Sequence, residues 1–327
     1  MTTRKFCLPM ARRLWHKRRM RTHTRLLLAM VIFGVLPLTA RAAETILNVM
    51  VTNDDGVAAD GVDVLVEALR ANPNLNVTVI APATNQSGKG DSFTTTSNLT
   101  SAAATTKSGF TATAIGGSPT GGTPADTVLF GFKEGLPAPP NLVVSGINFG
   151  QNIAEAVTIS GTVGAGLWAA RLGIPAFAVS AGIVTSGSGS PNYADAAKYT
   201  ARLVEEFRKK KPFQKKMVEK DAPKYGMVLN INFPTCPSGS VRGVKVVPIG
   251  RVTNVTGYTG GPDVWTPTVE TGNGVATDCS STLAAPTSDL EALNNGFASV
   301  TPLSADLTVS GAKLKDYAFV EKLWPVK

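Results

Sequence analysis

Two adjacent carboxylates, Asp54 and Asp55, directly follow an apolar run in the segment Ile46–Gly56, which reads ILNVMVTNDDG. Neighbouring carboxylates repel each other unless a positive charge lies between them. Their hard oxygen atoms suit Mg²⁺, Mn²⁺ or Ca²⁺. An isolated Asn-Asp-Asp-Gly is also typical of an Asx-rich turn or a helix cap, so the pair alone leaves both interpretations open.

The neighbouring elements place this acidic pair at the edge of a parallel sheet. The run Ile46–Val51 is rich in β-branched residues, which is typical of a fully buried parallel strand. Downstream, Gly61–Leu69 has apolar residues at helical spacing. The order strand, acidic turn, helix puts both carboxylates at the carboxyl end of a strand, where open α/β sheets bind their ligands.

Two further polar loops follow predicted strands and converge on the same edge. They are Asn85–Gly88 and Ser145–Asn152, and they contribute the Ser87 hydroxyl and the Asn148 amide oxygen. Oxygen donors of this kind bind Mg²⁺ or Mn²⁺ while the ion keeps some of its waters. We therefore expect a divalent metal ion, Mg²⁺ or Mn²⁺, to be held by Asp54, Asp55, Ser87 and Asn148.

A predicted anion site adjoins the metal site. Ser160-Gly161-Thr162 opens the predicted helix Val163–Leu172, and the backbone N–H groups of a helix N-terminus bind anions. With Asn152, these residues would contact a phosphate. Each loop taken singly is ordinary turn chemistry, but a metal beside a phosphate pocket predicts hydrolysis of a phosphoryl ester.

The rest of the chain predicts an α/β fold, with a doubly wound, mainly parallel sheet. Thr123 and Pro124 have the residue types of a helix start. The basic run Arg208–Lys211 is predicted to be a solvated helix terminus. Further strands are predicted at 77–80, 110–115, 141–144, 174–180, 227–233 and 298–307, and further helices at 123–132, 192–210 and 288–296.

Residues 1–42 have the pattern of a secretory signal peptide. A basic segment precedes the apolar stretch Leu26–Ala40, and Ala40-Arg41-Ala42 offers a cleavage site. The apolar stretch is short for a membrane span, so we expect export to a periplasmic or extracellular location and no stable membrane anchor, with a retained anchor as the alternative. The chain carries +9, but 1–42 hold ten basic residues and no acid, which leaves −1 for the remainder. We therefore expect no binding to a nucleic-acid duplex.

Histidine and cysteine usage narrows the chemistry further. Both histidines, His16 and His23, lie in the predicted leader, so a mature chain would have no Ser-His-Asp triad and no histidine-ligated metal. Cys236 and Cys279 form an even pair in a chain predicted to be exported. We expect a disulfide between them, with two free thiols as the alternative.

The segment 257–286 is rich in Gly, Thr, Pro and Ser and is too long for an ordinary connection. It is predicted to be an insert, a lid or an extended hairpin. The resulting division is a signal peptide at 1–42, a catalytic core at 43–256, this insert, and a C-terminal part of the same domain at 287–327.

Eight short blocks resemble the survival protein SurE family, in the family's order between about Ile46 and Thr308. They are NDDG (53–56), APxxNxSG (81–88), TPADxV (123–128), SGINxGxN (145–152), SGTV (160–163), LGIPAFAVS (172–180), LNINFP (229–234) and SVTPLSADLT (299–308). The resemblance implies a Rossmann-like fold with a C-terminal swapped extension that builds homodimers or homotetramers. It also implies metal-dependent hydrolysis of nucleoside monophosphates, and of short polyphosphates in some members.

Carried over by motif, the metal ligands are Asp54, Asp55, Ser87 and Asn148, and the phosphate contacts are Asn152, Ser160, Gly161 and Thr162. The sequence departs from the family pattern at Gln86, where a basic residue is common, at Ile159, where an aromatic is usual, and at Trp168, where an acidic residue is frequent. Asn-Gln-Ser-Gly looks like the exported acid-phosphatase branch. These departures leave the substrate preference open.

The leading hypothesis is an exported, metal-dependent 5′-nucleotidase or acid phosphatase. Because histidine is lacking, we expect water bound to the metal ion to attack the phosphate, positioned by the catalytic carboxylates Asp54 or Asp55. A covalent aspartyl phosphate is the alternative mechanism. The alternative function is a catalytically silent exported protein that binds phosphorylated ligands.

Overall fold

The structure, a computed structural model, describes residues 44–117, 122–183, 190–220, 224–251, 255–269, 277–308 and 316. The predicted signal peptide, 1–42, lies outside the described residues, as does most of 309–327. Within the described part, no helix has the length and apolarity needed to cross a membrane.

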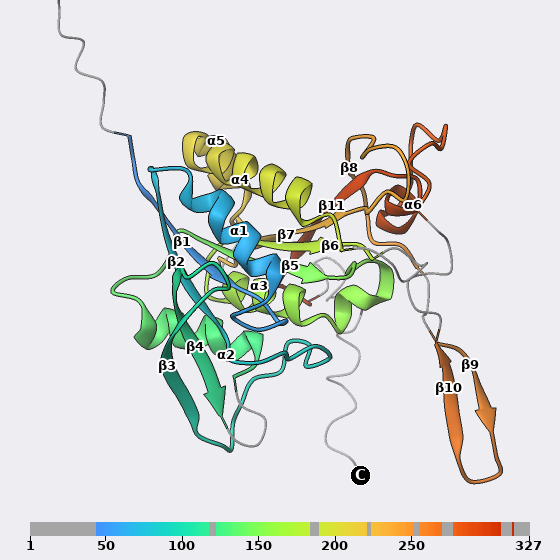
Figure 1. Cartoon of the computed structure of the whole chain (residues 1–327), viewed down its shortest axis with the longest axis horizontal. Coiled ribbons are helices and arrows are strands. Elements are labelled where there is room, and N and C mark those ends of the chain that lie inside the picture. Colours follow the sequence, from blue (N-terminus) through green and yellow to red (C-terminus); the bar gives the residue numbers. More distant parts are fainter. Residues whose placement is uncertain are drawn as a thin grey trace, which may run out of the picture. The chain divides into compact units, whose positions relative to one another are not determined.

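Nine of the described strands form one sheet in the order β3-β4-β2-β1-β5-β6-β7-β11-β8 (Figure 1). The central strands from β4 to β7 run parallel, and β3 and β11 are antiparallel to β4 and β7. The predicted α/β class with a doubly wound, mainly parallel sheet is confirmed. The strands are β1 Leu47–Thr52, β2 Leu75–Pro82, β3 Leu99–Thr105, β4 Thr111–Gly117, β5 Leu142–Phe149, β6 Ala176–Ala181, β7 Met227–Phe233, β8 Val244–Val246 and β11 Ala298–Ser304.

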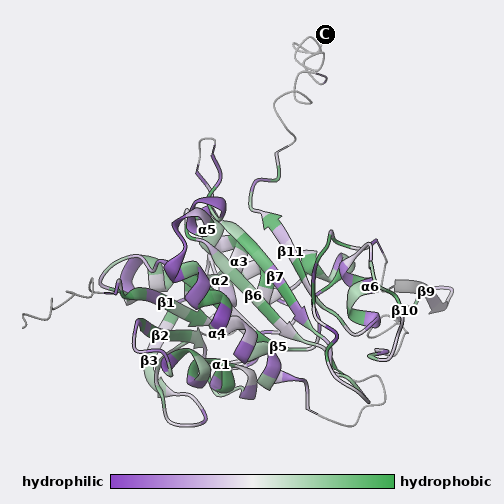
Figure 2. Cartoon of the chain, turned by 90° about the horizontal axis from the view of Figure 1, so that it is seen from above, coloured by the Kyte–Doolittle hydropathy of each residue, from purple (hydrophilic) through white to green (hydrophobic). Residues whose placement is uncertain are grey.

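Helices cover both faces of the sheet, which is why its central strands are largely apolar. On one face Val49 and Val51 of β1 belong to a core with α1 and α4. On the other face Met50 of the same strand belongs to a core with α2 and α3. Figure 2 shows the apolar residues of β6 and β7 in green. The helices are α1 Asp60–Arg70, α2 Pro124–Phe130, α3 Gly161–Arg171, α4 Tyr193–Lys209, α5 Lys211–Lys216 and α6 Asp289–Asn294.

Helix starts follow the capping residues. Thr123 and Asp126 form a reciprocal capping box at α2, and Pro124 occupies the first turn as predicted. Ser160 Oγ accepts from Val163 N–H at 3.1 Å and so begins α3. The short helix α5 was not predicted.

Strand β5 is longer than predicted. Ser145–Asn152 was predicted to be a loop, but Ser145 to Phe149 continue the strand, and pairing with β6 resumes after an irregularity between Ser145 and Asn148. At Gly146, φ is +138° and a Cβ would lie 2.2 Å from Val179 O. Only glycine permits this close approach of the two strands, so the polar residues are part of the sheet edge.

Part of the predicted insert is a hairpin. Strands β9 (Val255–Gly260) and β10 (Trp265–Val269) pair with each other in a separate two-stranded sheet, drawn as an arm in Figure 1. Residues 270–276 of the insert lie outside the described part. Cys236, which follows β7, forms a disulfide with Cys279.

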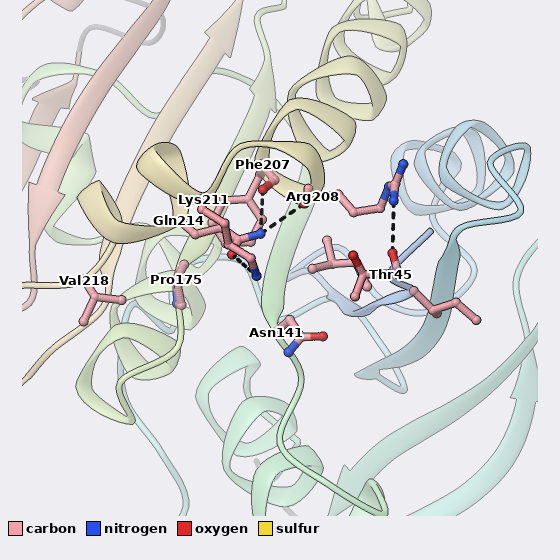
Figure 3. A pocket seen from close by; sticks show the side chains of 10 residues that line it. Thr45, Asn141, Pro175, Phe207, Arg208, Lys211, Gln214 and Val218 are labelled. Carbon is pink, nitrogen blue, oxygen red and sulfur yellow. Dashed lines mark hydrogen bonds between the residues drawn. The ribbon is translucent and has the colours of Figure 1, made fainter. Parts of the chain in front are cut away.

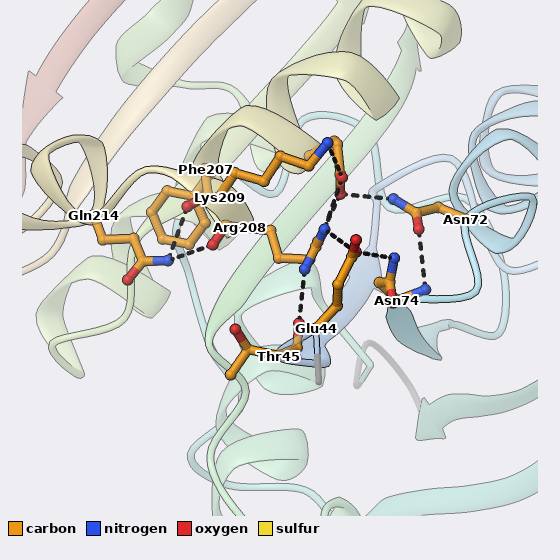
Figure 4. A network of polar contacts seen from close by, with 9 residues as sticks. Glu44, Thr45, Asn72, Asn74, Phe207, Arg208, Lys209 and Gln214 are labelled. Atoms are coloured by element: carbon orange, nitrogen blue, oxygen red, sulfur yellow. Dashed lines mark hydrogen bonds and ion pairs between the residues drawn. The ribbon is translucent and has the colours of Figure 1, made fainter. Parts of the chain in front are cut away.

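A polar network lies at the amino edge of the sheet, where the parallel strands begin. It is centred on Arg208, which lies in the last turn of α4 (Figure 4). Arg208 was predicted to be solvated, but its side chain is 4% exposed. Its guanidinium donates to Glu205 at 2.7 and 2.8 Å, to Glu44 at 2.8 Å and to Thr45 O at 3.0 Å. Arg208 is buried because it joins α4 to the start of β1.

A cavity of about 260 Å³ lies beside Arg208, with Lys211 among its lining residues (Figure 3).

Candidate active site

Asp54 is at the carboxyl end of β1 and is only 4% exposed. Thr162, in the first turn of α3, donates its hydroxyl to Asp54 Oδ1 at 2.6 Å. Burial raises the pKa of Asp54 from 3.8 to about 6, the charge of Asp55 adds to the rise, and hydrogen bonds from Thr162 oppose it. The carboxylate is therefore fixed in place at the cost of unfavourable desolvation.

Asp55 is held from a different element. Its Oδ2 accepts from Phe149 N–H, at the end of β5, at 2.9 Å. Burial raises the pKa of Asp55 as well, against the hydrogen bond from Phe149. Among the described residues, no Lys or Arg forms an ion pair with Asp54 or Asp55. Two partly buried carboxylates thus stand together without a protein cation.

The loop with Ser87 packs onto the acidic turn. Gln86 N–H donates to Asp54 O at 2.7 Å. Gly56 has φ +105°, and a Cβ there would lie 3.1 Å from the Thr84 backbone. Ser87 is exposed and its N–H donates to Asn85 Oδ1 at 2.8 Å. Backbone contacts therefore bring the predicted Ser87 ligand to the same edge as the carboxylates.

Asn148 is 8% exposed, and its Nδ2 donates to Gly150 O at 2.7 Å. This bond orients the amide so that Oδ1 is available to a ligand. Over the described residues, no three His, Cys, Asp or Glu side chains cluster so as to hold a metal ion. The predicted donor set has two carboxylates only, and it depends on the neutral oxygens of Ser87 and Asn148.

The predicted phosphate residues gather beside Asp54. A Cβ on Gly161 would lie 2.9 Å from Asp54 Oδ2, so the start of α3 touches the carboxylate. Asn152 Nδ2 donates to Ser180 Oγ at 2.9 Å and to Thr162 Oγ1 at 3.3 Å. Acidic turn, Asn152 and the Ser160 cap therefore form one continuous site.

Comparison with known proteins agrees with this geometry. The family model described as "Survival protein SurE" matches residues 49–255. The chain belongs to the survival protein SurE family. The 5′/3′-nucleotidase SurE of Photorhabdus laumondii is 33% identical over 272 residues, which cover 82% of this chain and 93% of that protein. The 5′-nucleotidase SurE of Pelobacter propionicus is 33% identical over 268 residues, covering 80% and 95%. The crystal structure of the SurE protein from Aquifex aeolicus is similar with a TM-score of 0.63 and 29% identity, covering 84% of this chain and 99% of that one.

In this SurE-family chain, buried residues of β7 support the site in a way that the sequence analysis missed. Asn152 O accepts from Asn230 Nδ2 at 2.8 Å and from Asn232 Nδ2 at 3.1 Å, and Asn152 N–H donates to Asn232 Oδ1 at 2.7 Å. Both asparagines are fully buried. The two asparagines are two residues apart in an otherwise apolar strand, and this spacing predicts that both face the same side of the sheet.

Trp168, one of the departures from the family pattern, ties the Ser87 loop to α3. Its Nε1 donates to Asp91 O at 2.7 Å, and its ring meets Phe93 edge-to-face at 5.0 Å. Arg171 forms an ion pair with Asp91 at 3.2 Å. The Arg171 guanidinium also lies over the Trp168 ring, 5.0 Å from its centroid, so an apolar and a cation–π contact occupy the position where an acidic residue is frequent in the family.

Proposed function

We propose that this protein is a metal-dependent phosphatase that acts on nucleoside monophosphates. The alternative, a catalytically silent protein that binds phosphorylated ligands, is not favoured. As a SurE-family member whose curated relatives are named nucleotidases, it is a hydrolase of phosphoric monoesters. One observation carries the metal dependence. Asp54 and Asp55 stand together without a basic partner in the described structure, directly beside the N-terminus of α3.

The residues present fit a divalent cation. Asp55 Oδ2 accepts from Phe149 N–H, while no donor among the described residues bonds to its Oδ1. The Asn148 amide is oriented by Gly150, and the Ser87 hydroxyl is exposed. With Asp54, these are hard oxygen donors, which favour Mg²⁺ or Mn²⁺ over softer metals. When bound, such an ion lowers the pKa of water and neutralises charge on the phosphoryl group.

The chain's own residues bind and orient the substrate. The first backbone N–H groups of α3 have no intrahelical acceptor and favour an anion at its N-terminus. Ser160 Oγ caps Val163 N–H at this end of the helix, and Asn152 is held beside it by its bond to Asn232. Thr162 fixes Asp54 and Phe149 N–H fixes Asp55, so both carboxylates are positioned to orient an attacking water molecule.

Two exposed apolar side chains favour a nucleoside as the leaving group. Phe149 is 57% exposed next to Asn148, and Ile159 is 67% exposed next to Ser160. Phe149 adjoins the predicted metal site in sequence and Ile159 adjoins the predicted phosphate site, and an aromatic ring can stack on a nucleobase. The choice of base and of 5′ or 3′ phosphate is part of the test.

Export and self-association are further parts of the proposal. The described fold begins with Glu44, whose side chain accepts from Asn74 and Arg208, so a cleavage near Ala42 would leave the folded domain intact. An isolated two-stranded hairpin is marginally stable by itself. The β9–β10 hairpin exposes Tyr258, Val264 and Trp265, and a second copy of the chain in a homodimer or homotetramer would cover them.

Phosphate release by purified residues 43–327 tests the function. We expect release from nucleoside 5′- or 3′-monophosphates, its loss with EDTA, and its return when Mg²⁺ or Mn²⁺ is added. Full turnover by protein verified as metal-free would overturn the metal dependence. Tight phosphate binding with no release from any nucleotide would support the silent binding protein instead.

A further inference from the structure

Asp289 is a buried carboxylate outside the predicted site. It is the first residue of α6, beyond the β9–β10 hairpin, and it is 0% exposed. Its acceptors are filled by backbone groups. Oδ1 accepts from Gly250 N–H and from Leu290 N–H, both at 2.7 Å, and Oδ2 accepts from Ala154 N–H at 3.0 Å.

The contact with Ala154 links α6 to the active-site segment. Ala154 has φ +51°, and among the described residues it is the only non-glycine in the left-handed region. It begins a short 3₁₀ helix, Ala154–Thr158, that leads directly to Ser160. Alanine disfavours this conformation, so an outside contact has to hold it there.

Ala154 also fixes the direction in which the chain leaves Asn152. Asn152 is bonded to Thr162, and Thr162 is bonded to Asp54. A displacement of residue 154 would therefore be transmitted to the phosphate contact and to the start of α3. Placement of this kind matters, because an error of 1 Å in a reacting group costs on the order of 10²-fold in rate.

We propose that Asp289 is a positioning residue. It holds Ala154 in its left-handed conformation and thereby sets the place of Asn152 and of the phosphate cradle at α3. It does not touch the substrate. The inference rests on the proposed function, because it assigns the phosphate site that this residue serves.

Asp289→Asn is the main variant. The asparagine amide keeps one oxygen acceptor and replaces the other carboxylate oxygen by an N–H₂ donor. Either Ala154 N–H or Gly250 N–H therefore loses its acceptor. We expect kcat/KM for a nucleoside monophosphate to fall about 10- to 100-fold and the affinity for inorganic phosphate to fall with it. Asp63→Asn is the matched control. Asp63 is a buried carboxylate of α1 that accepts at 2.8 Å from the N–H of Ser108, between β3 and β4, and its variant should keep phosphate affinity.

Ala154→Gly in the Asp289→Asn background separates positioning from general destabilisation. Glycine adopts φ +51° without strain, so the double variant should regain at least part of the lost phosphate affinity. A merely structural role of Asp289 predicts no such rescue. Unchanged phosphate affinity in Asp289→Asn, or a loss that Ala154→Gly leaves untouched, would overturn the proposal.

Hydrogen–deuterium exchange tests the contact without a variant or an activity. In wild-type protein, the Ala154 amide should exchange more slowly than the neighbouring Glu155 amide, because it is bonded to a buried carboxylate. Fast exchange at Ala154 would overturn the proposal even if Asp289→Asn fails to fold. Wild-type protein that binds inorganic phosphate but hydrolyses no nucleotide would contradict the proposed function alone, since the phosphate affinity of Asp289→Asn still decides the role of Asp289.

Discussion

The pKa values of the carboxylates are shifted in opposite directions at the two edges of the sheet. At the amino edge, hydrogen bonds from Arg208 lower the pKa of Glu205 from 4.5 to about 2. At the carboxyl edge, burial raises the pKa of Asp54 from 3.8 to about 6. The charged form is favoured by its surroundings at the first edge and disfavoured at the second.

This difference separates a structural role from a functional one. Glu205 and Glu44 join α4 to the start of β1 through Arg208, and their charges are compensated within the chain. Without a bound cation, the desolvation and mutual repulsion of Asp54 and Asp55 lower the free energy of unfolding. A bound cation would remove that penalty. Uncompensated carboxylates at the carboxyl end of a strand are the better indicator of a site.

The largest expected effect is on activity at the carboxyl edge. Asp55→Asn keeps the shape of the side chain but removes its charge. Changes to residues that only hydrogen-bond to a metal ligand already cost about 10- to 100-fold, so we expect phosphate release to fall by more than about 100-fold. Initial rates with saturating Mn²⁺ measure the effect, with Asp63→Asn as the control. Near-wild-type turnover of Asp55→Asn would reduce Asp55 to a turn residue, since Asn suits a turn or cap almost as well.

The second effect is on stability with and without metal. In the presence of EDTA, Asp55→Asn should unfold at the same temperature as wild type or higher, because repulsion with Asp54 is relieved. A ligand at 100 times its Kd stabilises the native state by about 2.7 kcal/mol, so Mn²⁺ should raise the Tm of wild type clearly. The variant should show a much smaller rise. Equal Mn²⁺-induced shifts in both proteins would contradict the assignment of Asp55 as a ligand.

The third effect is on stability at the amino edge. Arg208→Met removes a guanidinium that makes four hydrogen bonds to Glu44, Thr45 and Glu205. Hydrogen bonds that involve charged groups contribute about 1.5–3 kcal/mol each to the free energy of unfolding. Because solvent screens part of this network, we expect the variant to lose about the contribution of one such bond. Arg202→Met, an exposed position on the same helix, is the control. Urea unfolding should show the loss while kcat of the folded enzyme stays the same. A matching fall in kcat would mean that the two edges are coupled.

The smallest effect is the pH dependence, which should have opposite signs at the two edges. Glu205 has a lowered pKa, so its contribution is complete above pH 4.5 and is lost as the pH falls towards about 2. Asp54 has a raised pKa, so the metal-free protein loses stability as the pH rises from 3.8 through about 6. Urea unfolding in EDTA across this range tests both. Glu205→Gln should remove the first dependence and Asp54→Asn the second, and a variant that removes neither would refute the pKa assignment concerned.

Local signals made much of the fold and the site predictable. Strand β1, the α2 capping box and the Ser160 cap each depend on residues close together in the chain. The acidic turn and Ser160-Gly161-Thr162 are motifs of the same local kind, and the sheet topology then brings them together. Their metal and phosphate roles remain predictions.

The features that were missed depend on contacts between distant residues. Arg208 is buried because it meets Glu44, 164 residues away, and a run of basic residues gives no indication of that partner. Strand β5 continues past Ser145 because β6 pairs with it on both sides of Gly146, at Ser145 and again at Asn148, although Ser and Gly both favour a turn. Nothing in the sequence around Asp289 marks a contact with Ala154, 135 residues earlier.

The position of β11 in the sheet sets the order in which the molecule can be completed. Strand β8 is synthesised before β11, yet β11 lies between β8 and β7. As the chain emerges from the ribosome, β8 has no place in the sheet until residues 298–304 have followed. The acidic turn emerges early, whereas the last strand and α6 arrive near the end. A nascent chain therefore carries Asp54 and Asp55 long before α6 and the last strand have been made, and completion of the sheet is a late event of biosynthesis.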